Sequence, residues 1–431
     1  MGRKIKNIYD YLCDYTEKEI DYMIYDLSFE DRILLKERYG YDLHNPVKND
    51  KFTLNQEQQY YNHLVPKMRR LLAKSKINIT DPKTIQNIEL DLKKNLLELI
   101  SNRKSNKEIC EILNIGTKQL YDLLIDLKNN GLMLDKKYCS DGTIIYKTIT
   151  NFGELKRASV FGQTKNIMTD YKENRIKLLL ISDLHFGNEL ERKDLIDRAF
   201  NYCIKNDIHI ILCGGDLIDG TFSKGNQKIY DLYKQIEYFV NNYPHDKSIL
   251  TFSVAGDHDY SAFSSKGLNL NEICNNFRHD IIIGGYNNSL IHIKNDEILL
   301  YHRMEGRTMM ETTAPLILHG HLHQYKTSME NNKLNVTLPS LSDINNSLPG
   351  ALELNIGFKK GYFDNVIIKH IYFENKDIIL SESAFNLSEN RKIKYVEPYR
   401  TQKPLTETPK SDEETPESEK KLQLSLTNKP Q

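Results

Sequence analysis

Five short apolar runs in the second half of the chain each lead into aspartate or histidine, and this pattern limits the fold more than any other feature. The runs cover residues 176–182, 209–213, 248–254, 297–301 and 314–318. They alternate with helical stretches, which predicts strands joined by helices. Further strands are expected at 350–356 and 366–373. The pattern predicts an α/β (α+β) domain and favours two sheets over one.

The motifs that follow the five runs contain residue types that bind metals. In chain order they are Ser182-Asp-Leu-His185, Gly214-Gly-Asp-Leu217, Ala255-Gly-Asp-His-Asp259, Tyr301-His302 and His319-Gly-His-Leu-His323. Open α/β sheets hold their ligands at the carboxyl ends of strands, so position and residue type agree. A lone histidine is usually a surface or core residue, but five such motifs in order predict a metal centre.

This order of motifs resembles the calcineurin-like metallophosphoesterase family, whose signature runs D-x-H, G-D, G-N-H-[D/E], H, G-H-x-H. The resemblance covers roughly residues 174–380. It implies a two-sheet sandwich flanked by helices. It also implies a phosphoester hydrolase that depends on two divalent metal ions and uses a metal-bridging hydroxide.

The resemblance also implies a role for each motif residue. One cation is bound by Asp183, His185 and His323, and Asp216 bridges to a second cation, which His302, His321 and Asp257 complete. His302 is preferred over the nearby His292 and His319 because it directly follows the apolar Leu299-Leu-Tyr. Imidazole and carboxylate ligands suit Mn, Fe, Zn, Co or Ni rather than Ca, and Mn²⁺ is the expected ion.

Two residues beside the expected metals carry the proposed acid chemistry. His258 is expected next to the phosphate, where it stabilises charge or protonates the leaving oxygen, and Asp259 is expected to orient its imidazole. Asp257 stands where the family has asparagine. A carboxylate there still ligates, but it adds negative charge near an anionic substrate and binds the metal more tightly.

The first 150 residues are expected to be mostly helical. Residues 1–78 are expected to form a helical, helix-turn-helix-like region, with an N-cap at Ser28 and a capping box at Thr53 and Gln56. Within it, residues 27–75 resemble the promoter-binding helix pair of bacterial sigma factors. A second capping box, at Ser105 and Glu108, begins another helix. This helix is followed by the turn Asn114-Ile-Gly116 and by a second helix that Thr117 caps. A two-strand hairpin then turns at Asp141-Gly142. This order, within 79–150, resembles the winged helix-turn-helix family.

A winged helix docks its second helix in the major groove of DNA. Candidate DNA contacts in the two helical regions are Lys67, Arg69, Arg70 and Lys118. Residues 1–170 hold 28 Lys plus Arg against 24 Asp plus Glu, so the basic surplus is small. A solvated charged face is the alternative, and many winged helices bind protein or dimerise.

Composition places limits on the whole chain. Lys plus Arg and Asp plus Glu are both 59, so the net charge is zero and the surface is not a polycation. No apolar stretch is long enough to predict a membrane span, and the N-terminus does not resemble a secretory signal. The six cysteines form no CxxC pair. A cytoplasmic protein is therefore expected. Residues 151–173 are expected to form a linker, 174–385 the metallophosphoesterase domain, and 386–431 a disordered tail.

The neighbouring domains give the hint about substrate. A tethered DNA-binding module would raise the local concentration of DNA at the catalytic face. The favoured hypothesis is therefore a nuclease or phosphodiesterase acting on DNA. The alternatives are a protein or nucleotide phosphatase with a regulatory N-terminal half, and a DNA-binding protein whose phosphoesterase fold is silent.

Overall fold

The structure is a computed structural model. It describes residues 17–39, 53–75, 82–149, 163–166, 171–222, 226–303, 312–344, 348–373 and 377–387, together with Ile8, Leu12 and Tyr15. The chain divides into two units, Met1–Arg391 and Lys392–Gln431, and every described residue belongs to the first. The predicted disordered tail lies outside the described residues from residue 388 onward.

The first helices form where their caps predict them. They are α2 (Glu17–Asp26), α3 (Phe29–Tyr39), α4 (Leu54–Gln59), the π-helical turn η1 (Tyr60–Leu64) and α5 (Val65–Ser75). Ser28 accepts from the backbone of Asp31 ahead of α3, and Thr53 and Gln56 form the predicted capping box of α4. The π-helical turn η1 leads directly into α5, and Pro66 lies in the first turn of α5.

The next segment has the predicted order of helices followed by a hairpin. It comprises α6 (Pro82–Ser101), α7 (Asn106–Leu113), α8 (Thr117–Asn129), β1 (Leu134–Tyr138) and β2 (Ile144–Thr148). The capping box of Ser105 and Glu108 is present. The cap of α8 was predicted wrongly, because its N-cap is Gly116, and Asp26 of α2 accepts the backbone N–H of Thr117 instead.

The remaining elements build two sheets and the helices beside them. The strands are β3 (Gln163–Asn166), β4 (Arg175–Ile181), β5 (Ile210–Cys213), β6 (Leu250–Ser253), β7 (Ile281–Ile283), β8 (Asn288–Ile293), β9 (Asp296–Tyr301), β10 (Leu316–His319), β11 (Lys326–Glu330), β12 (Lys333–Thr337), β13 (Ala351–Lys359), β14 (Tyr362–Phe373) and β15 (Asp377–Asn386). The helices are α9 (Lys193–Lys205), α10 (Leu232–Asn242), α11 (Asp257–Lys266) and α12 (Leu270–Phe277).

Two large sheets are present, as the sequence favoured. One has seven strands in the order β15-β14-β13-β4-β5-β6-β7, and the other has six in the order β11-β12-β10-β9-β8-β3. The expected linker at 151–173 is partly wrong, because Gln163–Asn166 within it forms β3 and pairs with β8 at the edge of the six-stranded sheet.

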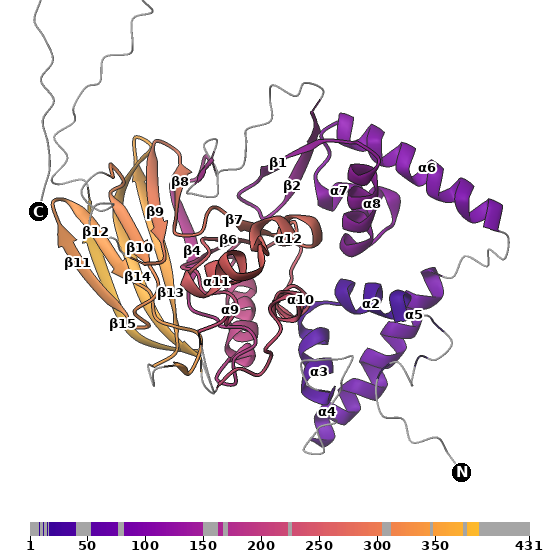
Figure 1. The fold of residues 1–431 in the computed structure, drawn as a ribbon, viewed down its shortest axis with the longest axis horizontal. Coiled ribbons are helices and arrows are strands. Elements are labelled where there is room, and N and C mark those ends of the chain that lie inside the picture. The colour runs from indigo at the N-terminus through magenta and orange to yellow at the C-terminus, as the bar shows by residue number, and fades with distance from the viewer. Residues whose placement is uncertain are drawn as a thin grey trace, which may run out of the picture. The chain divides into compact units, whose positions relative to one another are not determined.

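Strand β4 shows how the sequence forms three layers. Side chains alternate across a strand, so its neighbouring residues face opposite sides of the sheet. Leu178 and Leu180 belong to a core shared with residues of the six-stranded sheet, such as Leu300. Leu179 and Ile181 belong to a core shared with α9 and α10. Figure 1 shows the resulting sandwich, with α9 to α12 along the outer side of the seven-stranded sheet.

Candidate metal centre

The strand arrangement gathers the predicted motifs at one edge of the two sheets. Strands β4, β5 and β6 are parallel neighbours in the seven-stranded sheet, and β9 and β10 are parallel neighbours in the other. Parallel neighbours end at the same edge. The residues that follow these five strands therefore converge, although they are far apart in the chain: Asp183 and His185, Asp216, Asp257 and His258, His302, and His321 and His323.

Five of these residues have an unusual backbone conformation. The φ angles are +55° for Asp183, +48° for His185, +52° for Asp216, +68° for His321 and +56° for His323. Side chains other than glycine rarely adopt this left-handed region, and such residues cluster at functional sites. The turns after β4, β5 and β10 thus accept backbone strain in order to aim these side chains at one place.

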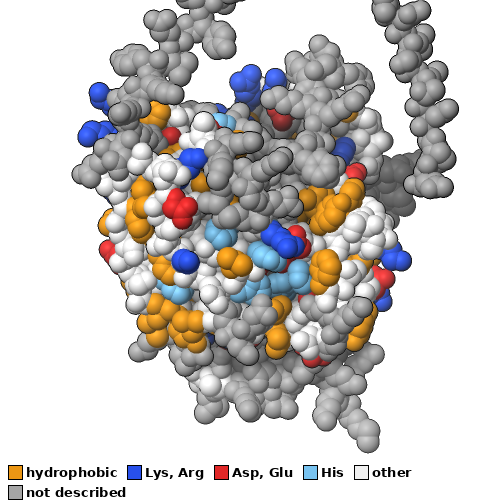
Figure 2. Space-filling view, turned by 60° about the vertical axis from the view of Figure 1, so that its left-hand side comes forward, with side chains coloured by type: hydrophobic (Ala, Val, Ile, Leu, Met, Phe, Trp, Pro, Cys, Tyr) orange, Lys and Arg blue, Asp and Glu red, His pale blue; other side chains and the backbone are white. Residues whose placement is uncertain are grey.

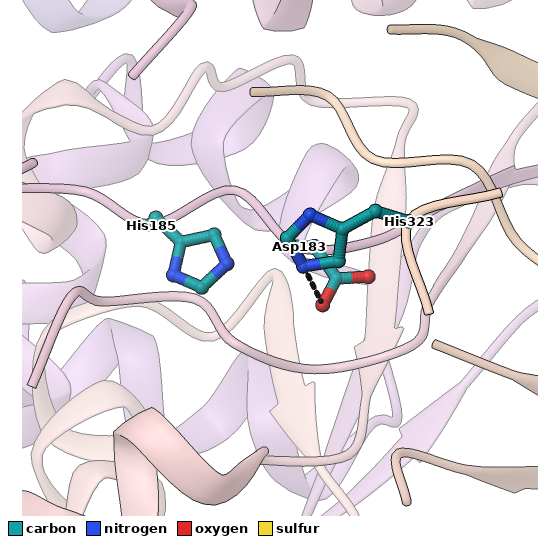
Figure 3. Close-up of side chains that lie close together, drawn as sticks. All are labelled: Asp183, His185 and His323. Atoms are coloured by element: carbon teal, nitrogen blue, oxygen red, sulfur yellow. Dashed lines mark ion pairs between the residues drawn. The ribbon is translucent and has the colours of Figure 1, made fainter. Parts of the chain in front are cut away.

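The first cluster consists of Asp183, His185 and His323, which offer ligand atoms within 4.8 Å of one another. Figure 3 shows the Asp183 carboxylate and the His323 ring facing each other, with His323 Nε2 at 3.3 Å from Asp183 Oδ1. The His185 ring centre lies 5.5 Å from that of His323. All three residues are buried.

The second cluster consists of Asp216, His302 and His321, also within 4.8 Å. His302 Nε2 lies 3.1 Å from Asp216 Oδ2. Asp257 adjoins this cluster, because its Oδ2 lies 3.8 Å from His321 Nδ1. Figure 2 shows a face of the molecule on which histidine side chains gather, with acidic and basic side chains beside them. The second cluster is nearer the surface than the first, because His321 is partly exposed, whereas all three residues of the first cluster are buried.

Asp216 joins the two clusters. Its Oδ2 lies 3.9 Å from His185 Nε2 of the first cluster and 3.1 Å from His302 Nε2 of the second. It also lies 4.0 Å from His258 Nε2. Gly256 permits this approach, because a Cβ there would lie 2.0 Å from Asp216 Oδ1. Asp216 is therefore shared between the two clusters.

Backbone carbonyls fix the orientation of three histidine rings. His302 Nδ1 bonds to Gly214 O at 2.8 Å, His258 Nδ1 bonds to Asp219 O at 2.6 Å, and His323 Nδ1 lies 3.5 Å from Ile344 O. In each case the Nδ1 atom donates, so the Nε2 atom, which has a lone pair when the ring is neutral, is directed into the site. Metal-binding histidines commonly have this second contact.

The charges of the cluster depend on one another. Burial raises the pKa of the Asp183 and Asp216 carboxyls, but nearby histidines outweigh it and hold both pKa values below their ordinary range. Burial lowers the pKa of His185 to about 3, so its ring is neutral near pH 7. Burial also opposes protonation of His302, yet the charge and hydrogen bond of Asp216 raise its pKa to about 10.

The residues present fit a pair of divalent cations. His185 is 1% exposed, and neither of its ring nitrogens has a hydrogen-bond partner among the residues that the structure describes. A buried polar group without a partner is costly, so an imidazole in this state is explained by a bound ligand. Imidazole nitrogens mixed with carboxylate oxygens are donors for Mn²⁺, Fe²⁺ or Zn²⁺.

The predicted role of Asp259 is wrong. Its carboxylate is fully buried and accepts the backbone N–H groups of Leu217, Ile218 and Gly256 at 3.0, 2.9 and 2.8 Å. His258 Nδ1 bonds instead to the Asp219 carbonyl. Burial, followed by the charge of Asp216, raises the pKa of Asp259 to about 7. Asp259 therefore shapes the loops after β5 and β6 and does not orient His258.

Asp219 is a site residue that the sequence analysis missed. Its carbonyl holds His258, and its Oδ1 accepts Asn188 Nδ2 at 2.7 Å. A backbone carbonyl can come from any residue type, so its role leaves no mark in the sequence. The one available signal was its position three residues after Asp216.

Two other histidines near the motifs serve the fold. His319 Nε2 and Thr337 Oγ1 are 2.7 Å apart, and the His319 ring stacks on Tyr301 with centres at 5.2 Å. His292 Nε2 lies 3.9 Å from Glu297 Oε2 on the neighbouring strand. The structure therefore brings His302 into the centre, as preferred, and leaves His292 and His319 outside it.

The side chains predicted to contact DNA interact with other residues of this chain. Lys67 pairs with Asp31, and Arg70 Nε donates to Pro66 O at 3.3 Å. Lys118 Nζ, near the start of α8, lies 5.6 Å from the centre of the Tyr25 ring. Arg69 is exposed. The contacts of Lys67 and Lys118 do not favour phosphate binding in this arrangement.

Comparison with known proteins agrees with the motifs. The family model described as calcineurin-like phosphoesterase matches residues 176–338, which include all five motifs. Residues 176–338 are a calcineurin-like phosphoesterase domain. The chain that carries this domain is a hydrolase of phosphoric esters. No curated protein matches the chain.

Several solved structures are similar to about half of this chain. An archaeal phosphodiesterase is 13% identical over 48% of this chain and 100% of its own, with a TM-score of 0.32. Vacuolar protein sorting 29 from Cryptosporidium parvum is 15% identical over 50% and 100%, with a TM-score of 0.32. YfcE, a phosphoesterase from E. coli, is 15% identical over 49% and 100%, with a TM-score of 0.34.

Proposed function

We propose that the chain is a cytoplasmic, dinuclear metal-dependent phosphodiesterase that cleaves DNA. The observation that carries the proposal is the position of Asp216 between His185 of one cluster and His302 of the other. One carboxylate shared by two clusters supports two cation positions over one. None of the helices that the structure describes combines the length and apolar composition needed to cross a bilayer.

Each cluster has an assigned cation in this proposal. Asp183, His185 and His323 hold one, and Asp216 is shared with a second that His302, His321 and Asp257 hold. When bound, the two cations supply a hydroxide near neutral pH and neutralise charge on the phosphate. Mn²⁺ is the proposed ion because the donors mix imidazole and carboxylate.

His258 is proposed to protonate the leaving oxygen. Its ring is partly exposed, and its Nδ1 bonds to Asp219 O. Its Nε2 lies 4.0 Å from Asp216 Oδ2. A positioned imidazole is an effective acid near neutral pH. Phe222 contacts the ring edge to face, with centres 5.2 Å apart, and limits its movement.

The proposal of DNA as substrate is supported by the order of elements in the preceding segment. Helices α7 and α8 with the hairpin β1–β2 follow the order of a winged helix. If that module binds DNA, the tether raises the concentration of DNA near the metal centre.

One observation favours the alternative of a phosphatase with a regulatory N-terminal half. Asp26 of α2 accepts the Thr117 N–H at the start of α8, and a Cβ on Gly116 would overlap Asp26. The end of α8 that would enter a DNA groove is therefore packed against α2.

The test is hydrolysis by the purified chain with Mn²⁺. Linear and single-stranded DNA, bis(p-nitrophenyl) phosphate and p-nitrophenyl phosphate are offered in parallel, with His258→Ala as the matched inactive variant. DNA degradation that His258→Ala abolishes supports the proposal, and turnover of the monoester alone supports the phosphatase. DNA binding whose affinity does not fall as salt rises would contradict phosphate contacts.

A further inference from the structure

Arg303 lies directly after the proposed ligand His302, and its side chain reaches Asp257. Arg303 Nη1 is 3.4 Å from Asp257 Oδ2, and its backbone N–H donates to Asn287 Oδ1 at 3.3 Å. The side chain of Arg303 is 61% exposed and that of Asp257 is 38% exposed. The pair therefore lies on the solvent-exposed side of the candidate metal centre.

Asp257 is in contact with the second cluster on its other side. The Oδ2 atom that faces Arg303 also lies 3.8 Å from His321 Nδ1. One carboxylate oxygen thus lies between a proposed ligand and a guanidinium. A cation held by His321 would share this oxygen with Arg303, so the two positive groups are linked through it.

We propose that Arg303 is a positioning residue that balances the charge of Asp257 and so keeps the centre able to hold an anionic phosphoester. This inference rests on the proposed function. Two divalent cations are matched by the carboxylates of Asp183, Asp216 and Asp257 together with an attacking hydroxide, which leaves no net positive charge for the substrate. The guanidinium restores one positive charge at the side where Asp257 would repel a phosphate.

Arginine suits this position for a second reason. An arginine side chain presents several donors in one plane, which match phosphate oxygens. In the part of the chain that the structure describes, Nε and Nη2 of Arg303 have no hydrogen-bond partner. Those donors remain available for a substrate while Nη1 faces Asp257.

The test is a double-mutant cycle on the full chain. The variants are Arg303→Ala, Asp257→Asn and the two together, with Arg303→Lys as the conservative change. Lys205→Ala is the matched control, because Lys205 is an exposed cation at the far end of α9 from the strand edge. The readouts are Mn²⁺ affinity by titration calorimetry, and KM and kcat for bis(p-nitrophenyl) phosphate.

In the Asp257 protein, Arg303→Ala should raise KM by about tenfold and lower kcat less, because the charge of Asp257 is then unbalanced and repels the substrate. It should also tighten the weaker Mn²⁺ site by about threefold, because a neighbouring cation is lost. In the Asp257→Asn background both effects should shrink to less than about twofold, and Arg303→Lys should retain most of the wild-type KM.

Equal effects of Arg303→Ala in both backgrounds would overturn the inference, as would effects no larger than those of Lys205→Ala. The calorimetric measurement needs no turnover. If the wild-type chain binds Mn²⁺ but cleaves no diester, the proposed function fails, and the coupling of Arg303 to Asp257 in Mn²⁺ affinity still decides the charge balance.

Discussion

His302 Nε2 lies 3.1 Å from Asp216 Oδ2, and the two residues follow strands of different sheets. Asp216 follows β5 of the seven-stranded sheet, and His302 follows β9 of the six-stranded sheet. The centre therefore forms only when the two sheets pack with the carboxyl ends of β5 and β9 at the same edge.

Asp216→Asn should weaken both cation sites, since Asp216 is shared, whereas Asp183→Asn should weaken one. We expect Asp216→Asn to reduce the affinity of both Mn²⁺ equivalents by more than about 100-fold, because even outer partners of metal ligands contribute 10–100-fold. Titration calorimetry with metal analysis measures this. Loss of a single equivalent in Asp216→Asn would show that the carboxylate is not shared.

His258→Ala should lower kcat without changing metal content. A positioned acid contributes roughly 10²–10⁴-fold, and the loss should be largest for a poor leaving group such as an alkyl or nucleoside oxygen. A series of diesters with leaving groups of rising pKa measures this, with His292→Ala as the control. An equal loss for every leaving group would rule out the acid role.

Asp259→Ala should act on stability. The Asp259 carboxylate accepts three backbone N–H groups, and without it those donors are buried and unpaired. A buried donor left unpaired costs about 1–3 kcal/mol, so the three together predict a loss of at least about 3 kcal/mol in unfolding free energy. Chemical denaturation measures it. If Asp259→Ala left the stability unchanged but altered how kcat depends on the leaving group, Asp259 would act through His258, as the sequence predicted.

The buried pair of Arg278 and Asp280 should make stability depend on pH. Arg278 Nη2 lies 2.7 Å from Asp280 Oδ2, and both residues are buried. Burial raises the pKa of Asp280, but the charge and hydrogen bonds of Arg278 outweigh it and hold the pKa well below its ordinary value. The stabilisation is therefore present above about pH 3.9, the unfolded value, and is lost as pH falls below it.

Asp280→Asn measures that contribution. At pH 7 the variant should be less stable by about 3–5 kcal/mol, because a buried guanidinium loses its partner. The difference between wild type and variant should shrink as the pH is lowered below about 4. A difference that stays constant from pH 7 to pH 3 would contradict the assignment of the charge pair.

The sequence predicted the elements that carry strong local signals. The strands before Asp183 and Asp216, and the capping boxes at Thr53 and Ser105, follow from side-chain pattern and cap chemistry. The motif residues were placed at strand ends for the same reason, and the structure brings them together.

What the sequence did not predict depends on contacts distant in the chain. Strand β3 has little apolar character and forms by pairing with β8. The start of α8 is satisfied by Asp26 and not by Thr117, and Asp259 is drawn to the amides of Leu217 and Ile218. No local pattern marks these partners, because each is fixed only when the layers pack.

Anomalous diffraction at the manganese edge, from crystals of the full chain grown with Mn²⁺, would locate the bound cations. Two peaks are expected, one among Asp183, His185 and His323 and the other among Asp216, His302 and His321. A single peak, or peaks away from Asp216, would contradict the proposed pair of cations.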